Sequence, residues 1–286
     1  MKQMKSNEHP GPLARITHLK PRAFYFSFYS LILLLFCSCE QDNVRVFSIG
    51  DSTMSNYNLE EMDEHYGGSN FPRRGWAMEL SAFLDDKAEV VNRAVSGRSS
   101  KNFIVQGHWD KVINDIQEGD FLIIQFGHND QNADDPKRYT EAYGEYKENL
   151  LRFVKEAEAL GARPLIATPI ARRRFDAEGK TMDTHGDYAT ASIEAAKESG
   201  VPLIDLNKMT IDYLSELGDE DSKALFLHIE PGVFENLTEG LKDNTHLSKK
   251  GACAVAALFV EGVEDSDSPL KKYHLENKPD CNLKIK

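Results

Sequence analysis

The chain has 286 residues, of which 41% are hydrophobic and 28% are charged, and its formal net charge is −12. This composition is typical of a globular protein, and the length is sufficient for one large domain. Beyond residue 38 the chain carries 29 basic and 45 acidic residues. That balance argues against nucleic acid as a partner, because such binding needs basic residues that neutralise phosphates.

The first 39 residues have the features of an export signal. Basic residues precede an apolar run, FYFSFYSLILLLFC, at 24–37, which has the length of a signal-peptide core and is short for a membrane span. Ser38 and Cys39 follow, and a small residue before a cysteine resembles the lipobox of bacterial lipoproteins. We therefore expect export to the periplasm or cell surface, with Cys39 lipidated and anchored in a membrane. An ordinary cleaved signal is the alternative.

Strands and helices alternate from residue 44 onward. Short apolar runs predict strands, and apolar residues three or four positions apart predict helices. The predicted strands are 44–49, 88–92, 120–126, 163–169 and 201–206. The predicted helices are 76–84, 107–116, 139–160, 186–199 and a last helix that Ser248 caps and that runs to 263. This alternation indicates a three-layer α/β/α sandwich around a five-stranded parallel sheet.

No repeat or linker interrupts 44–263, so we expect a single domain at 40–264. The polar tail at 265–286 is expected to extend over the surface. Cys253 and Cys281 could form a disulfide in an oxidising compartment. Cys253 lies in an apolar helical run, so a buried free thiol is the alternative.

Residues capable of chemistry follow several of the predicted strands, and in such a fold active sites lie at the carboxyl ends of the strands. Ser52 follows the first strand, Gly97 the second and Asn129 the third, while Asp243 and His246 precede the last helix. Each alone has a structural explanation as a cap, a turn residue or a polar residue opening a helix. Together they supply the nucleophile, the base, its orienting group and the oxyanion donors that acyl transfer needs.

These residues lie in motifs that resemble a known family. GDS at 50–52, Gly97, GHND at 127–130 and DNTH at 243–246 resemble the four blocks of the SGNH, or GDSL-like, hydrolases. The resemblance covers most of 44–263 and implies a flavodoxin-like sheet. The longer stretches GDSTM, VVNRAVSGRSSKNF and GDFLIIQFGHNDQ resemble the rhamnogalacturonan acetylesterases within that family.

The resemblance implies a role for each residue. Ser52 would be the nucleophile, His246 the general base and then acid, and Asp243 the group that orients His246. The backbone N–H groups of Ser52 and Gly97 and the side-chain amide of Asn129 would form the oxyanion hole. No metal or cofactor is implied, and the sequence contains no cluster of His, Cys or carboxylate residues with metal-ligand spacing.

The resemblance also implies a substrate, acetylated pectic polysaccharide. Arginine binds carboxylates through paired N–H groups, so we expect Arg98 and Arg174 to contact a polyuronate chain, together with His185. Surface ion pairs are the alternative explanation for the arginines at 172–174. Two other functions stay open. One is an esterase acting on another acetylated glycan, such as xylan, or on small esters, and the other is a non-catalytic carbohydrate-binding lipoprotein.

Overall fold

The computed structural model describes residues 43–281, and within them the strands and helices alternate along the chain. The strands are β1 (Val44–Gly50), β2 (Ala88–Asn92), β3 (Phe121–Gln125), β4 (Arg163–Ala167), β5 (Leu203–Ile204), β6 (Phe226–Ile229) and β7 (Leu241–Leu247). The α-helices are α1 (Leu59–Tyr66), α2 (Ser100–Val105), α3 (His108–Ile113), α4 (Lys147–Glu158), α5 (Asp187–Ser199), α6 (Leu206–Ser222) and α7 (Lys249–Asp265). Short 3-10 turns lie at Trp76–Met78, Leu80–Ala82, Lys223–Leu225 and Pro269–Tyr273, and a π-helical turn at Ala142–Tyr146 precedes α4.

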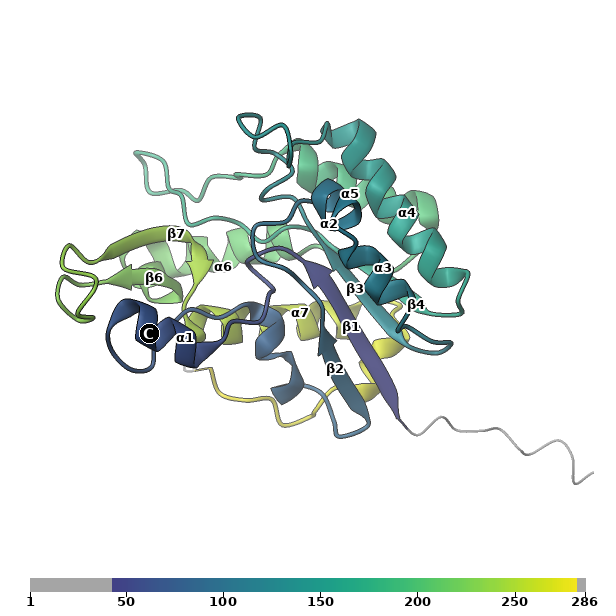
Figure 1. Cartoon of the computed structure of the whole chain (residues 1–286), viewed down its shortest axis with the longest axis horizontal. Helices are drawn as coiled ribbons and strands as arrows, with labels where there is room; N and C mark the ends of the chain where they lie inside the picture. The colour runs from purple at the N-terminus through teal and green to yellow at the C-terminus, as the bar shows by residue number, and fades with distance from the viewer. Residues whose placement is uncertain (1–42, 282–286) are drawn as a thin grey trace, which may run out of the picture. The chain divides into compact units, whose positions relative to one another are not determined.

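The first five strands form one parallel sheet in the order β2-β1-β3-β4-β5. Figure 1 shows this sheet at the centre of the molecule, with α2 to α5 grouped to one side and α7 to the other. β2 lies on one side of β1, and the chain then crosses to the other side of β1 to form β3, β4 and β5. The crevice between the carboxyl ends of β1 and β3 is therefore the topological switch point, where such folds place their active sites.

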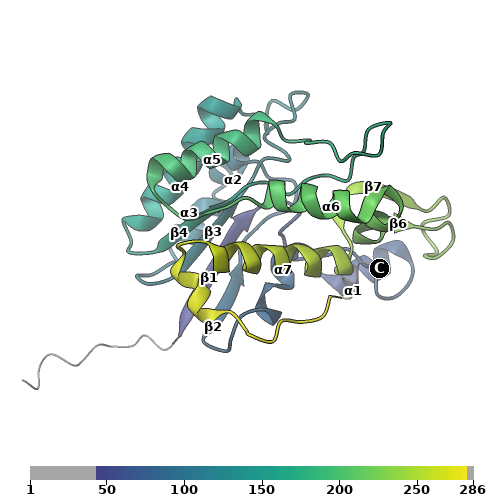
Figure 2. The ribbon, with the colours of Figure 1, turned by 180° about the vertical axis from the view of Figure 1, so that it is seen from behind.

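Side chains of β1 alternate between the two faces of the sheet, and each face has its own apolar core. Phe47 and Ile49 pack with residues of α2 to α5. Val44 and Val46 pack with residues of α6 and α7, the helices that Figure 2 shows in front of the sheet. Because both faces are covered by helices, the inner strands β1, β3 and β4 are mainly apolar. The predicted three-layer α/β/α fold is confirmed.

Two predicted helices differ in the structure. The segment 76–84 forms 3-10 turns, because it is fixed by contacts with the turn after β1. A Cβ on Gly75 would lie 2.3 Å from the Met54 carbonyl carbon, and the Trp76 backbone N–H donates to Thr53 O at 2.8 Å. The helix predicted at 139–160 becomes regular only at Lys147, since Gly144 has non-helical φ and ψ of −108° and −114°.

The sequence predicts that the DNTH motif lies in the turn that opens the last helix, and this prediction was wrong. Asp243 and His246 lie within β7, which pairs antiparallel with β6 in a separate two-stranded sheet. Asp243 pairs with Leu227 and Leu247 pairs with Phe226, so residues 244–246 have no partner on β6. This insertion is a large β-bulge, a device that re-aims side chains next to functional sites.

The tail is not the extended appendage that its polarity suggested. Leu270 is fully buried, and His274 pairs with Leu84 through an isolated β-bridge. A disulfide joins Cys253 on α7 to Cys281, so these two cysteines are paired. None of the helices between residues 43 and 281 is long and apolar enough to cross a bilayer. The expected export segment, with Cys39, lies outside the described residues.

Candidate active site

Ser52, His246 and Asp243 form a continuous line of hydrogen bonds. Ser52 Oγ lies 3.0 Å from His246 Nε2, and His246 Nδ1 lies 2.6 Å from Asp243 Oδ2. Ser52 is on the turn that leaves β1, while the other two side chains come from the bulge in β7. Side chains 194 positions apart in the sequence thus meet at the carboxyl edge of the main sheet.

The bulge fixes the protonation pattern of this line. Asp243 Oδ1 accepts the backbone N–H groups of Thr245 and His246, at 2.8 and 3.0 Å. Partial burial raises the pKa of Asp243. The hydrogen bonds and the nearby imidazole lower this pKa by more than burial raises it, and the result is about 2. Asp243 is therefore a carboxylate at neutral pH and accepts a hydrogen bond from the Nδ1–H group of His246. The lone pair on Nε2 is left to face the Ser52 hydroxyl.

Unused N–H donors lie in the loops after three neighbouring strands. Among residues 43–281, neither the Ser52 nor the Gly97 backbone N–H has a hydrogen-bond acceptor. The Gly97 loop is held against the end of β1, because the Val95 N–H donates to Gly50 O at 3.0 Å. Gly97 has a φ of +76°, and a Cβ added there would meet nothing within 4 Å. Glycine thus suits this conformation and leaves open space above the loop.

The Asn129 amide is held from both of its ends. Its Nδ2 donates one hydrogen to Arg98 O at 3.0 Å, and its Oδ1 accepts from Arg138 Nη1 at 3.3 Å. Arg138 is itself paired with Asp135 at 2.9 Å. The second Nδ2 hydrogen is left free, so Asn129 can supply a third donor beside Ser52 and Gly97.

This geometry agrees with the comparison to known protein families. The chain matches the family described as GDSL-like lipase/acylhydrolase over residues 46–259. The chain belongs to this family. It is therefore an SGNH esterase, and the predicted resemblance to GDSL-like hydrolases is confirmed.

Individual relatives add detail. The chain is 37% identical to the rhamnogalacturonan acetylesterase RhgT of Bacillus subtilis over 230 residues, which covers 80% of this chain and 94% of RhgT. It is 34% identical to the probable rhamnogalacturonan acetylesterase YesY of the same organism, covering 79% and 94% of the two chains. The crystal structure of YxiM from B. subtilis superposes with a TM-score of 0.64 and 26% identity, covering 78% of this chain and 56% of that one.

The GDSL serine turn is braced by buried polar contacts. Asp51 Oδ1 accepts the backbone N–H and the hydroxyl of Thr53, at 2.9 and 2.8 Å. Gln125, at the end of β3, donates to the same Thr53 hydroxyl at 2.9 Å. The Tyr57 hydroxyl donates to the carbonyl oxygen of Ser52 at 2.7 Å. These bonds fix the turn on both sides of the serine.

The two neighbours of Asn129 in the GHND motif are buried. Asp130 accepts the N–H and hydroxyl of Ser100, at 2.9 and 2.5 Å, and the Thr140 hydroxyl at 3.0 Å, so it ties the loop after Gly97 to its own loop. Burial raises the pKa of Asp130 to about 7, despite these donors. His128 Nδ1 lies 3.2 Å from Asp51 Oδ2, and burial lowers the pKa of His128, which favours a neutral imidazole.

The expectation that His185 lines the substrate groove was wrong. The side chain is 3% exposed, with Nε2 donating to Ile170 O at 2.8 Å and Nδ1 lying 2.6 Å from Gln131 Oε1. Burial lowers the pKa of His185 well below its usual value. It is a structural residue that holds the loop after β4.

Among the arginines considered from the sequence, some make hydrogen bonds or ion pairs within the protein and one does not. Arg173 is buried and binds Asn244 Oδ1 at 3.0 Å and the Asp219 carboxylate. Arg172 donates to the carbonyl of His128, and Arg98 donates to the carbonyl of Ser96 and to Gln106. Arg174 is exposed, and its side chain has no hydrogen bond or ion pair among the residues described.

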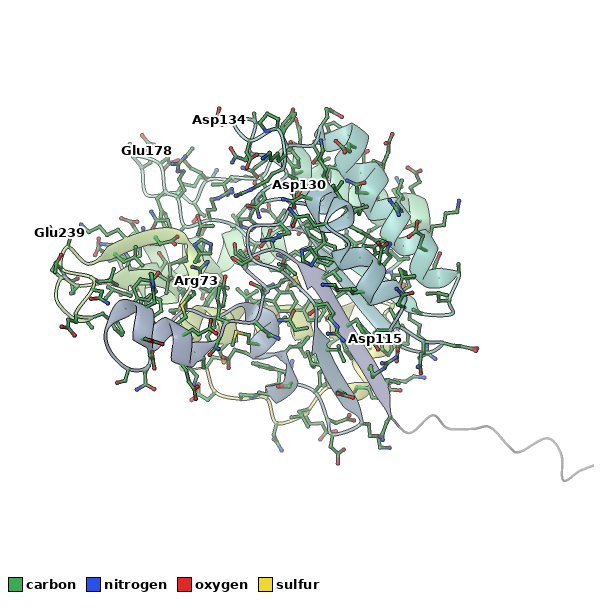
Figure 3. All side chains as sticks on the ribbon, in the orientation of Figure 1. Arg73, Asp115, Asp130, Asp134, Glu178 and Glu239 are labelled. Carbon is green, nitrogen blue, oxygen red and sulfur yellow. A yellow bond between two sulfur atoms is a disulfide. The ribbon has the colours of Figure 1, made fainter. Side chains whose placement is uncertain are left out.

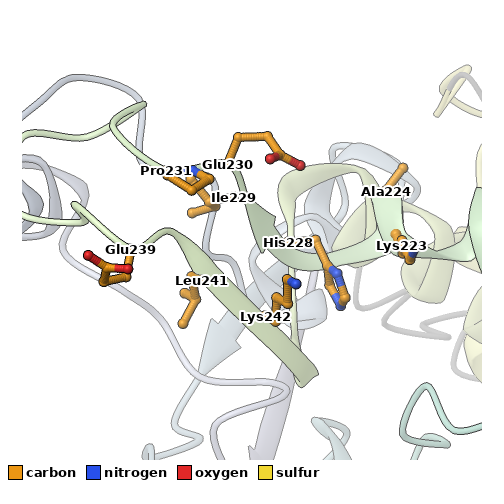
Figure 4. Close-up of a pocket in the computed structure, with 9 residues that line it drawn as sticks. All are labelled: Lys223, Ala224, His228, Ile229, Glu230, Pro231, Glu239, Leu241 and Lys242. Atoms are coloured by element: carbon orange, nitrogen blue, oxygen red, sulfur yellow. The ribbon is translucent and has the colours of Figure 1, made fainter.

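A pocket of about 530 Å³ lies on the β6–β7 hairpin (Figure 4), and one of its lining residues, Lys242, precedes Asp243 in the sequence. It is lined by Lys223, Ala224, His228, Ile229, Glu230, Pro231, Glu239, Leu241 and Lys242. Neither Ser52 nor His246 lines it, so this pocket does not contain the reaction centre. No group of His, Cys, Asp or Glu suited to hold a metal occurs in the part of the chain that the structure describes.

Proposed function

We propose that the protein is a serine carbohydrate esterase that removes O-acetyl groups from acetylated pectic polysaccharide of the rhamnogalacturonan type. The observation that carries this proposal is the hydrogen-bonded line from Ser52 through His246 to Asp243 in a GDSL-like chain. The likeness to RhgT, at 37% identity over 80% of this chain and 94% of RhgT, supports the substrate.

In the acylation step, Ser52 Oγ attacks the carbonyl carbon of the acetyl ester and its proton passes to His246 Nε2. The oxyanion that forms accepts hydrogen bonds from the N–H groups of Ser52 and Gly97 and from Asn129 Nδ2. Each donor of this kind contributes about 3 kcal/mol to the transition state. The intermediate collapses, the sugar oxygen leaves with the proton from Nε2, and Ser52 is acetylated.

Deacylation repeats the sequence with water as the nucleophile. Water gives a proton to His246 Nε2 as its oxygen attacks the acetyl carbon, and Ser52 Oγ leaves with that proton. Acetate is released and the free serine is restored. Throughout, the Asp243 carboxylate accepts a hydrogen bond from the Nδ1–H group of His246 and stabilises the positive charge that the imidazole carries between proton transfers.

Two arginines in the loop after β4 support an anionic substrate. Arg172 and Arg174 have no carboxylate within ion-pair distance among residues 43–281, although the chain is strongly acidic. Elsewhere on the surface, Arg45, Arg93 and Arg152 each pair with Asp or Glu. Arginines that stay without acidic partners in such a chain are suited to the carboxylates of a polyuronate.

We also propose that the protein is exported and anchored through a lipid on Cys39. The basic segment, the apolar run at 24–37 and the small residue before Cys39 support this. In cell fractionation, the wild-type protein is expected with the membranes and Cys39→Ser in the soluble fraction. Equal distribution of the two proteins would contradict the anchor.

Acetate release tests the function. The protein is expected to release acetate from acetylated rhamnogalacturonan faster than from acetylated xylan, with 4-nitrophenyl acetate as a small ester. Ser52→Ala should abolish release from all three. Ser55→Ala is the matched control, because the Ser55 hydroxyl is buried without a hydrogen-bond partner. Preference for xylan, or activity on the small ester alone, would discard the pectic substrate. No release by the folded wild type would favour a carbohydrate-binding role.

A further inference from the structure

We propose that Arg73, stacked on Tyr57 beside the nucleophile, binds the carboxylate of a uronic acid unit in the substrate. This inference rests on the proposed function and assigns the residue that distinguishes an acidic glycan from a neutral one. None of the arginines expected from the sequence is this residue.

The first argument is the position of Arg73. Its backbone pairs antiparallel with Ser248, two residues after His246. Its guanidinium carbon lies 4.5 Å from the centre of the Tyr57 ring, and the hydroxyl of that ring donates to Ser52 O at 2.7 Å. Arg73 is thus tied to both halves of the catalytic line. Figure 3 labels it in the region between α1 and β7.

The second argument is that the guanidinium has no acceptor. Its Nε is buried without a hydrogen-bond partner, and the side chain makes no ion pair with any described residue. The two Nη atoms also lack acceptors and are not among the buried unpaired atoms, so they reach solvent. The adjacent Arg74 is different, since it is buried and its Nη1 donates to the carbonyls of Phe71 and Arg73.

The third argument is the chemistry of this arrangement. Stacking on an aromatic ring holds a guanidinium in one plane. Two Nη groups in that plane match the two oxygens of a carboxylate, which they can bind together. Holding the fork in place beforehand reduces the entropy lost when the ligand binds. A carboxylate ligand would supply the acceptors that the protein itself does not.

The fourth argument is the space beside Tyr57. A pocket of about 470 Å³ is lined by Tyr57, Asn56, Asn58 and Ser96, among others. Ser96 precedes Gly97, so the pocket extends from the oxyanion loop to the ring on which Arg73 lies. Its amides can bind sugar hydroxyls, and Tyr57 offers a surface for a sugar ring. Glu61 also lines it, with its carboxylate bound by the Asn58 amide at 2.8 Å.

The test compares Arg73→Gln with the wild type on two forms of one substrate. One is acetylated rhamnogalacturonan oligosaccharide, and the other is the same material with its uronate carboxyls reduced to alcohols. Arg73→Gln is expected to lower kcat/KM on the acidic form by about 10- to 100-fold, mainly through KM, because a charge-assisted hydrogen-bond pair is lost. On the reduced form and on 4-nitrophenyl acetate it should stay within about twofold of wild type.

Two further variants make the test specific. Arg163→Gln is the matched control, because Arg163 also lies over an aromatic ring, at 5.3 Å from the centre of Phe121, but at the amino end of β4. It should act as wild type on every substrate. Arg73→Lys keeps the charge without the fork and should recover part of the loss. If Arg73→Gln folds poorly, the ratio of Arg73→Lys activity on the acidic and reduced substrates tests the same proposal.

The outcomes separate the two proposals. Equal activity of wild type and Arg73→Gln on the acidic substrate, or an equal loss on both forms, would overturn the role of Arg73 while leaving the esterase in place. No Ser52-dependent acetate release from the acidic substrate by the wild type would overturn the proposed function and this inference with it.

Discussion

Asp243 holds His246 through both of its carboxylate oxygens, one on the ring and one on the backbone. Oδ2 lies 2.6 Å from the ring Nδ1, and Oδ1 accepts the His246 N–H at 3.0 Å. The same side chain therefore shapes the turn and orients the base. Substitutions can separate these two effects.

Asp243→Asn and Asp243→Ala are expected to fail in different ways. In Asn, the amide oxygen can keep the backbone contacts, while the amide nitrogen would donate to Nδ1 and favour the wrong tautomer. We expect kcat to fall by about 10⁴ with little loss of stability. In Asp243→Ala, nothing selects the tautomer of the His246 imidazole, so some activity remains. Loss of the two backbone contacts in the turn lowers the unfolding free energy by about 1 kcal/mol. Steady-state kinetics gives kcat for the two variants, and chemical denaturation gives their unfolding free energies. Lower activity in Ala than in Asn would contradict this account.

Gly97→Ala is expected to cost activity as well as stability. A Cβ at a φ of +76° is strained by about 1–2 kcal/mol, and it would also stand in the open space above the oxyanion loop. Gly200→Ala is the matched control, since Gly200 has a φ of +75°, also with nothing within 4 Å, at the end of α5. Both variants should lose similar unfolding free energy, but only Gly97→Ala should lose kcat. Equal kcat in the two would argue against an oxyanion role for this loop.

Arg138 is expected to act on the reaction through Asn129. Asn129→Ala should lower kcat by about 10²–10³. Arg138→Ala should lower kcat by about tenfold with KM on 4-nitrophenyl acetate unchanged, because it removes the hydrogen bond that fixes the Asn129 amide. Lys137→Ala, at an exposed neighbouring position, should have no effect. A change in KM alone for Arg138→Ala would indicate a role in binding.

Asp130 predicts a specific dependence of stability on pH. Its pKa is raised to about 7 in the folded protein and is about 3.9 in an unfolded chain. The folded state therefore keeps a proton that the unfolded state has lost, and this contribution is full below pH 4 and disappears as pH rises through 7. The unfolding free energy of wild type minus that of Asp130→Asn should fall between pH 5 and pH 8. A constant or rising difference would show that Asp130 is already ionised at pH 5.

The parts of the fold that the sequence predicted are those with local signals. β1 and β2 are short and mainly apolar, and their predicted limits agree closely with the structure. Ser52, Gly97 and Asn129 could be placed together because parallel strands bring their carboxyl ends to one edge. The β6–β7 hairpin gave no comparable signal, since β7 is partly exposed, polar along most of its length and interrupted by the bulge.

Other features depend on contacts that no local pattern records. His185 looked like a surface histidine, but it is held by Gln131 from the loop after β3 and by Ile170 at the start of its own loop. Arg73 stood out in no motif, because its stacking partner is Tyr57, on the far side of α1 in the sequence. Arg138 lies in the loop that follows Asn129, and only the folded loop brings their side chains together.

The separation of Ser52 and His246 along the chain, 194 positions, has a consequence for biosynthesis. The ribosome makes the serine early and its base late, and the bulge that carries the base cannot form until both strands of the hairpin have emerged. A nascent or truncated chain ending before β7 therefore holds a serine with no partner to take its proton. Hydrolytic capacity therefore requires a chain that extends through β7, and a fragment that ends before it has the serine but not its base.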